Sequence, residues 1–256
     1  MTAPSPETAA LAASGLTKRF GAFVATDRVS LTVSAGARHA LIGPNGAGKT
    51  TLVNLLSGAA RPSAGTVHLG GVDVTALPPH RRVKLGLARS FQINRLFAEM
   101  TVLESIALAV RERRGLGGRW WRAAADWADA TDEAAALLVR LGLDDVAARR
   151  TSELPYGRQR LLEVGLALAL RPRVLLLDEP AAGIPAAESR PLIEMLAGLP
   201  REIAIVLIEH DMDLVFRFAE RITVLADGAI LAEGPPAAIA RDPLVRRIYL
   251  GEAGLG

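Results

Sequence analysis

The chain contains no cysteine, so a disulfide framework and a thiolate metal site are both excluded. It also lacks any apolar run near the roughly 18 to 20 residues that a membrane-spanning helix needs. The longest apolar runs, such as residues 203–208, are strand-sized. The stretch 1–15 carries Glu7 and has no basic residue before its alanines, which makes it a poor signal peptide. We therefore expect a soluble, cytosolic protein.

Charge of one sign is not in excess, because 30 basic residues face 27 acidic ones and the net charge is only +3. This balance does not indicate nucleic-acid binding, and we expect no nucleic-acid partner. Lysine is scarce, since only Lys18, Lys49 and Lys84 are lysines and the other basic residues are arginine. Lys49 is informative because it stands in a glycine-rich stretch, where a compact point charge fits and a wide guanidinium does not.

That stretch, GPNGAGKT at 43–50, matches the pattern G-x-x-x-x-G-K-[ST]. The glycines let successive backbone N–H groups point at a phosphate, and the polarity of a helix N-terminus adds to the attraction. Lys49 is expected to reach the β- and γ-phosphates, and Thr50 to ligate Mg²⁺. A plain glycine turn before a helix is the alternative. The apolar runs on either side suit a strand before the loop and a helix after it, and this context favours the phosphate loop. The stretch therefore indicates nucleotide binding, but it does not indicate what the nucleotide is used for.

A second set of polar residues follows two buried-strand runs. RVLLLDEP at 173–180 is typical of a strand buried on both faces of a parallel sheet, and such sheets bind ligands at their carboxyl ends. Asp178 is expected to hold Mg²⁺ through water, and Glu179 to orient or deprotonate an attacking water. The alternative is that the two carboxylates only mark the point where a strand leaves the core. The phosphate loop upstream favours the functional interpretation. His210 follows the run 203–208 in the same way; a lone histidine is more often structural, but the two other strand ends favour a role in catalysis.

Between these runs, LPYGRQ at 154–159 precedes an apolar helical stretch at 161–170. A turn before a helix exposes backbone N–H groups from Gly157 onward, which predicts a second anion site. The chain's own phosphate loop already holds a phosphate. We therefore expect this second site to serve another subunit.

Together these pieces resemble the ATP-binding cassette family over nearly the whole chain. RSFQINRLFAEMTVLES, DEPAAG, LIEHDMDLV and RRIYLGE are similar to ATPase subunits of branched-chain amino-acid importers. The resemblance implies an α/β fold with a P-loop NTPase core, an antiparallel β subdomain and an inserted α-helical subdomain. The core is expected over 1–92 and 154–256, and the helical subdomain over 93–153.

The resemblance also implies roles for individual residues. Phe20 is expected to stack on adenine, and the ATP phosphates to lie on Gly43, Pro44, Asn45, Gly46, Ala47, Gly48, Lys49, Thr50 and Thr51. Glu179, His210 and Gln92 (in Ser90-Phe91-Gln92) are the implied catalytic residues, and Thr50, Gln92 and Asp178 the implied Mg²⁺ ligands. The implied signature motif, which contacts the partner's ATP, is Leu154, Pro155, Tyr156, Gly157, Arg158 and Gln159.

In this family two cassettes form a head-to-tail dimer that sandwiches two ATP molecules. Two permease subunits and an extracytoplasmic substrate-binding protein complete the transporter. We therefore expect a peripheral subunit at the cytoplasmic face of the inner membrane that powers amino-acid uptake, paired in a heterodimer with a second cassette.

The chain departs from the family pattern at two prolines. Pro155 replaces the signature serine, and Pro185, in Gly183-Ile184-Pro185, stands where the family usually has an Asp or Asn after Gly-Leu. Pro155 offers neither an N–H nor a hydroxyl to a phosphate. One alternative is therefore a regulatory cassette that hydrolyses ATP weakly. A non-transport cassette ATPase is another, although such proteins tend to carry two cassettes or long coiled-coil insertions, and this chain has neither.

The scarcity of lysine leads to a prediction. Lys49→Arg should weaken nucleotide binding nearly as much as Lys49→Ala, because the loop accommodates a point charge and not a planar fork. The measurement is nucleotide affinity by calorimetry, with Lys84→Arg as the control outside the loop. Wild-type affinity in Lys49→Arg would show that the loop tolerates a guanidinium.

Overall fold

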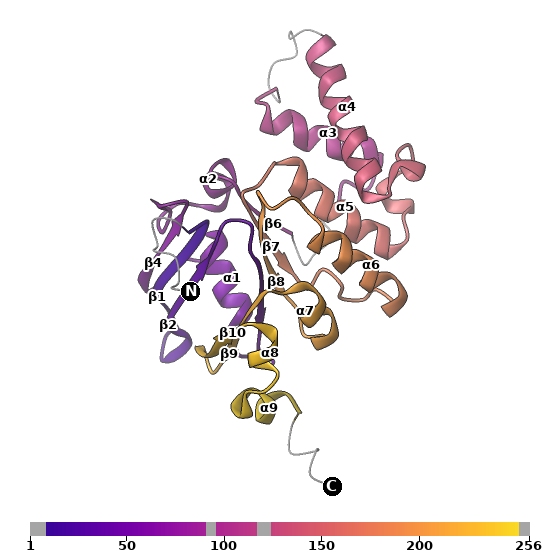
Figure 1. Cartoon of the computed structure of the whole chain (residues 1–256). Helices are drawn as coiled ribbons and strands as arrows, with labels where there is room; N and C mark the ends of the chain where they lie inside the picture. The colour runs from indigo at the N-terminus through magenta and orange to yellow at the C-terminus, as the bar shows by residue number, and fades with distance from the viewer. Residues whose placement is uncertain (1–8, 91–95, 117–123, 251–256) are drawn as a thin grey trace.

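The computed structural model describes residues 9–90, 96–116 and 124–250, which form two β-sheets with helices packed around them (Figure 1). The four-stranded antiparallel sheet has the order β2 (Phe23–Val33), β1 (Leu11–Phe20), β4 (Ala64–Leu69) and β5 (Val72–Asp73). The six-stranded sheet has the order β10 (Ala229–Gly234), β9 (Arg221–Ala226), β3 (Arg38–Ile42), β8 (Ala204–Ile208), β7 (Val174–Asp178) and β6 (Leu87–Arg89). Its strands from β9 to β6 pair in parallel, and β10 is an antiparallel edge.

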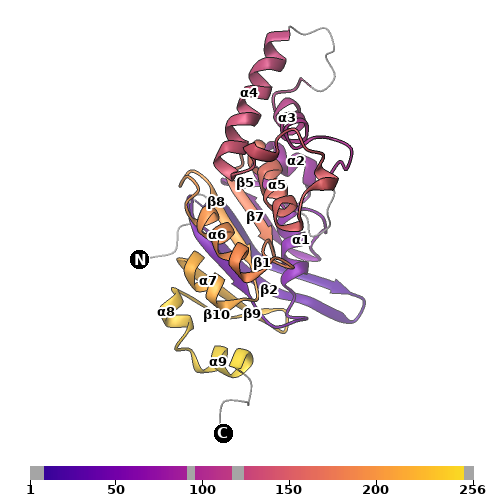
Figure 2. The same ribbon diagram turned by 90° about the vertical axis from the view of Figure 1, so that its right-hand side faces the viewer.

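The helices fall into four groups (Figure 1, Figure 2). Helix α1 (Lys49–Ser57) follows β3, and α2 (Pro79–Lys84) precedes β6. Helices α5 (Tyr156–Ala169), α6 (Ala186–Ala197) and α7 (Met212–Phe218) pack beside the six-stranded sheet. Helices α3 (Val102–Arg113) and α4 (Ala124–Leu141) project from it, followed by the short 3-10 helices Asp144–Val146 and Thr151–Glu153. Helices α8 (Pro236–Ile239) and α9 (Pro243–Leu250) end the described chain.

The parallel strands are buried on both faces, as their continuous apolar runs predict. In β7, Leu175 and Leu177 contribute to a core shared with α3 to α7. Val174 and Leu176 point the other way, into a core shared with α1 and the antiparallel sheet. The six-stranded sheet therefore lies between two hydrophobic layers.

Two helices begin at side-chain caps. Thr101 caps α3 by accepting a hydrogen bond from the Glu104 N–H at 3.2 Å, and the Glu104 carboxylate accepts one from the Thr101 N–H at 2.8 Å. Asp242 caps α9 by accepting from the N–H groups of Leu244 and Val245. The expected start of the helical subdomain falls in 91–95, outside the described residues, so that boundary stays a prediction. None of the described helices has the length and apolarity required to cross a bilayer.

A fully buried arginine holds the far end of α1, the helix that begins at the phosphate loop. The Arg82 guanidinium donates to the backbone oxygens of Leu55 and Leu56, at 2.8 and 2.6 Å, and to those of Leu77 and Thr75. Burial lowers the pKa of Arg82 to about 10. Carbonyl groups at a helix C-terminus have no partner within the helix, and a cation there is also favoured by the helix dipole. Arg82 therefore ties α1 to α2.

Arg82→Met should lower the free energy of unfolding by about 3 kcal/mol or more, since it leaves several buried carbonyl groups without a donor. Urea denaturation measures the change. Arg81→Met, on the exposed face of the same helix, is the matched control. An equal effect of the two substitutions would mean that the buried hydrogen bonds contribute nothing specific.

Candidate nucleotide-binding site

The glycine-rich loop joins β3 to α1, as the sequence predicts. Backbone crowding explains two of its glycines. A Cβ atom at Gly43 would lie 2.4 Å from the Leu225 carbonyl oxygen, and one at Gly48 would lie 2.4 Å from that of Ala25. Gly48 also has φ = 96°, a left-handed conformation that favours glycine. The loop is therefore pressed against neighbouring strands, which holds its shape.

A cavity of about 300 Å³ opens at this loop. It is lined by the loop and the first turn of α1, by Phe23 and Ala25 of β2, and by Glu179. Phe20, which the family resemblance places against adenine, is not part of this lining and has Lys18 Nζ 5.1 Å from its ring centroid. Phe23 is the aromatic residue that faces the loop, and sequence reasoning missed it. The stacking role of Phe20 stays a prediction.

Lys49 lies folded over the loop. Its Nζ donates to the backbone oxygens of Gly43 at 2.6 Å and Pro44 at 2.9 Å. Burial lowers the pKa of Lys49, while the carboxylates of Glu179 and Asp178 act in the opposite direction. The ammonium group is thus held within the loop and near both carboxylates that the sequence singles out, as a phosphate-binding cation needs to be.

Asp178 ends β7 and is held by an arginine. Arg89, the last residue of the neighbouring strand β6, places Nη2 2.8 Å from Asp178 Oδ2 and donates through Nη1 to Asn54 Oδ1 at 2.6 Å. Both partners of the ion pair are largely buried, with side-chain exposures of 14% and 2%. One side chain therefore links β6, β7 and α1. Sequence reasoning missed Arg89, although an arginine ending a buried strand directly before Ser90-Phe91-Gln92 was a usable signal.

Glu179 follows Asp178 and lines the cavity. Its N–H donates to the Ile208 oxygen at 2.9 Å, and its backbone then turns left-handed at φ = 49°. His210 stands at the end of β8, the strand between β3 and β7, and its side chain is 66% exposed. The structure thus brings the ends of these three strands together, as predicted. Gln92 lies outside the described residues.

The signature residues 154–159 lie apart from this cavity. Pro155 precedes α5, which begins at Tyr156, and none of the six is among the described residues that line the loop cavity. The Tyr156 ring packs on Gly183, where a Cβ atom would lie 3.0 Å from Cε1, and Tyr156 Oη accepts from Arg160 Nε at 3.0 Å. The signature turn therefore contacts the loop that follows Glu179.

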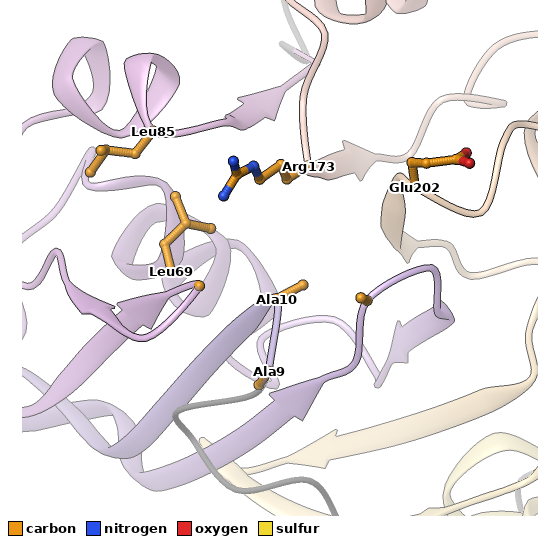
Figure 3. A pocket seen from close by; sticks show the side chains of 8 residues that line it. Ala9, Ala10, Leu69, Leu85, Arg173 and Glu202 are labelled. Carbon is orange, nitrogen blue, oxygen red and sulfur yellow. The ribbon is translucent and has the colours of Figure 1, made fainter.

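Another cavity, of about 380 Å³, lies at the opposite end of the sheet (Figure 3). Its lining includes Arg173 and Glu202, which directly precede β7 and β8, together with Ala9, Ala10, Leu69 and Leu85. Arg173 points towards Leu69 and Glu202 points away, so the two charges do not converge. The cavity at the phosphate loop, which is lined by Lys49 and Glu179, is therefore the candidate functional site.

Comparisons with known proteins agree with this geometry. A family model described as ABC transporter matches residues 26–182, more than half of the chain. The chain belongs to the ABC transporter family. A second model, described as branched-chain amino acid ATP-binding cassette transporter, matches residues 229–254 of this ABC protein.

Similarity to individual ABC proteins extends over nearly the whole chain. The high-affinity branched-chain amino acid transport ATP-binding protein LivG of Salmonella typhimurium is 42% identical over 250 residues, covering 95% of this chain and 98% of LivG. BraF of Pseudomonas aeruginosa, which carries the same description, is 40% identical with the same coverage. A crystal structure of an ABC transporter cassette in its ADP conformation has a TM-score of 0.83 at 30% identity, covering 95% of this chain and 99% of that one. A crystal structure of a nucleotide-free ABC transporter cassette has a TM-score of 0.82 at 30% identity, with the same coverage of both chains.

These similarities confirm the predicted family and the α/β fold class with its P-loop core. The protein is an ATP-binding ATPase subunit of an ABC transporter. The roles of the individual site residues stay predictions, which the geometry above supports to different degrees.

The buried ion pair of this ABC ATPase yields a stability prediction. Arg89→Met should lower the free energy of unfolding by about 3 to 5 kcal/mol, because it leaves a buried carboxylate without its partner. Adding Asp178→Asn to this variant should recover part of the loss. Arg201→Met, which breaks an exposed ion pair with Glu220, is the control and should cost about 1 kcal/mol or less. Similar losses in Arg89→Met and Arg201→Met, measured in urea, would contradict the prediction.

Proposed function

We propose that the protein hydrolyses ATP to drive the uptake of branched-chain or related amino acids. The full-length similarity to LivG and BraF carries this proposal. A cassette that acts outside transport is not favoured, because these relatives are transport subunits. Weak regulatory hydrolysis is not favoured either, because Lys49 and Glu179 line one cavity.

The loop of residues 43–51 is proposed to bind the ATP phosphates. Its backbone N–H groups and the N-terminus of α1 attract the negative charge, and Lys49 turns from its carbonyl partners towards the β- and γ-phosphates. The loop needs no rebuilding for this, because neighbouring backbone already fixes its shape at Gly43 and Gly48. Phe20 or Phe23 supplies the aromatic face for adenine.

Thr50 and Asp178 are the described residues whose oxygens would hold Mg²⁺, together with Gln92. In the described part of the chain no group of three or more His, Asp or Glu side chains gathers to hold a metal alone. This arrangement suits Mg²⁺, which usually binds through one or two carboxylates and the phosphates of its nucleotide. When bound, the ion neutralises charge on the phosphates.

Glu179 is proposed to orient the attacking water and to accept its proton. It follows Asp178 directly and lines the cavity at the phosphate loop, which supports this role. His210, at the end of the neighbouring strand, is proposed to contact that phosphate from the β8 side. Gln92 is proposed to assist from the segment that follows β6.

The active form is proposed to be a head-to-tail heterodimer with a second cassette subunit. The support is that residues 154–159 lie apart from the chain's own cavity, which suits a role at a partner's ATP. Two permease subunits and an extracytoplasmic binding protein are the further proposed partners. The assembly places this subunit at the cytoplasmic face of the membrane. Within the chain, residues 93–153 are proposed as the helical subdomain.

Glu179→Gln tests the hydrolytic role. We expect ATP affinity to stay near wild type while hydrolysis falls by about a hundredfold or more, because the amide cannot accept the proton. ATP binding and phosphate release are measured on the chain assembled with its transporter. Glu202→Gln, an exposed carboxylate beside the remote cavity, is the matched control. Near-normal turnover in Glu179→Gln would remove Glu179 from the role.

A further inference from the structure

One buried carboxylate at the site has no part in the proposed mechanism. Glu209 follows the last residue of β8 and is only 1% exposed. A charged group in such a position is costly unless it is well paired. Burial raises the pKa of Glu209, hydrogen bonds from two backbone N–H groups lower it, and the nearby Glu179 raises it. The residue therefore needs an explanation beyond packing.

The contacts of Glu209 join two loops. Its Oε1 accepts a hydrogen bond from the N–H of Ala181 at 3.1 Å, in the loop that carries Glu179. Its Oε2 accepts one from the N–H of His210 at 3.3 Å and lies 3.8 Å from His210 Nδ1. A single carboxylate at the end of β8 thus contacts the segments that carry Glu179 and His210, two of the residues proposed for catalysis.

The Ala181 N–H depends on this contact. Ala181 is buried, and its carbonyl oxygen is used in a turn by the N–H of Ile184 at 3.1 Å. A buried N–H that loses its acceptor carries the full cost of desolvation. Without the Glu209 carboxylate, the loop would have to move to find another acceptor.

The backbone at Glu179 explains why the loop needs an anchor. Its φ of 49° is unfavourable for a residue with a side chain, and such conformations persist only where surrounding contacts enforce them. On one side, the Glu179 N–H is held by the Ile208 oxygen. On the other, a turn closed by the Ala182 N–H on the Glu179 oxygen at 3.1 Å leads through Ala181, which Glu209 holds. Both anchors come from the end of β8.

We propose that Glu209 is a positioning residue for ATP hydrolysis, which fixes the left-handed turn at Glu179 by binding the Ala181 N–H and sets His210 beside it. The proposal rests on the proposed role of Glu179. It assigns Glu209 no contact with ATP. Loss of Glu209 should therefore affect the rate of hydrolysis and spare nucleotide affinity, since small misplacements of a reacting group reduce rates steeply.

The first test is amide hydrogen exchange on the nucleotide-free full chain, followed by NMR. In the wild type, the Ala181 amide should exchange at least about tenfold more slowly than that of Gly183, an exposed residue of the same loop, because a buried hydrogen bond closes the amide. In Glu209→Ala this protection should be lost while the amides of β7 stay protected. An unprotected Ala181 amide in the wild type overturns the proposal without any variant.

The second test separates binding from turnover in the assembled transporter. Glu209→Ala should lower kcat by on the order of 10- to 100-fold, with ATP affinity within about twofold of wild type. Glu209→Gln keeps the side-chain volume and one oxygen acceptor. Its kcat should therefore lie between that of Glu209→Ala and that of the wild type. Glu133→Gln is the control for lost ion pairing, because Glu133 of α4 pairs with Arg113, Arg114 and Arg171, none of which belongs to this loop. It should leave kcat and Ala181 protection near wild type.

The outcomes distinguish this proposal from the proposed role of Glu179. Wild-type kcat in a folded Glu209→Ala variant overturns the positioning role, even when Glu179→Gln is inactive. A parallel loss of ATP affinity also overturns it, because a general disturbance of the site would then explain the result. Normal turnover in Glu179→Gln would instead refute the hydrolytic role itself, while the exchange result at Ala181 would still stand.

Discussion

The parallel pairing of β8 between β3 and β7 is the constraint on which the site depends. Because the three strands run in the same direction, their carboxyl ends meet at one edge of the sheet, and each end carries a functional segment. Apolar layers cover both faces of the sheet, so polar groups collect at this edge. The hydrogen bond from the Glu179 N–H to the Ile208 oxygen extends the pairing one residue beyond β7, to the start of the loop that carries Glu179.

Three largely buried arginines each bind the end of a helix or strand that lies in or beside the six-stranded sheet. Arg82 donates to the C-terminus of α1, Arg38 to backbone oxygens at and after the C-terminus of α6, and Arg89 to Asp178 and Asn54. Each uses the several donors of one planar guanidinium to bind acceptors from different segments, which an ammonium cannot do in the same geometry. The scarcity of lysine in the sequence is consistent with this use. Lys49 is the exception, and its proposed target is a phosphate within the loop.

The loop after β7 is where this chain's own site approaches the residues proposed to serve a partner. Glu209 holds it at Ala181, and Tyr156 of α5 packs on it at Gly183. Movement of the loop at Glu179 would therefore change the packing of Tyr156 at the N-terminus of α5. Pro155 and Pro185 also fit this arrangement structurally, since they precede α5 and α6 and supply the extended backbone with which each helix begins.

The sequence by itself determined the phosphate loop, the two carboxylates after a buried strand, the parallel character of the core and the family. Each of these depends on local patterns in the sequence, such as the spacing of glycines or a run of apolar residues that ends in carboxylates. The partners of Asp178, Ala181 and Gly183 were decided only by the tertiary structure. Arg89, Glu209 and Tyr156 are 89, 28 and 27 residues from them along the chain, and the fold brings each pair together. The left-handed backbone at Glu179 is equally invisible in the sequence, because contacts from a neighbouring strand enforce it and no glycine marks it.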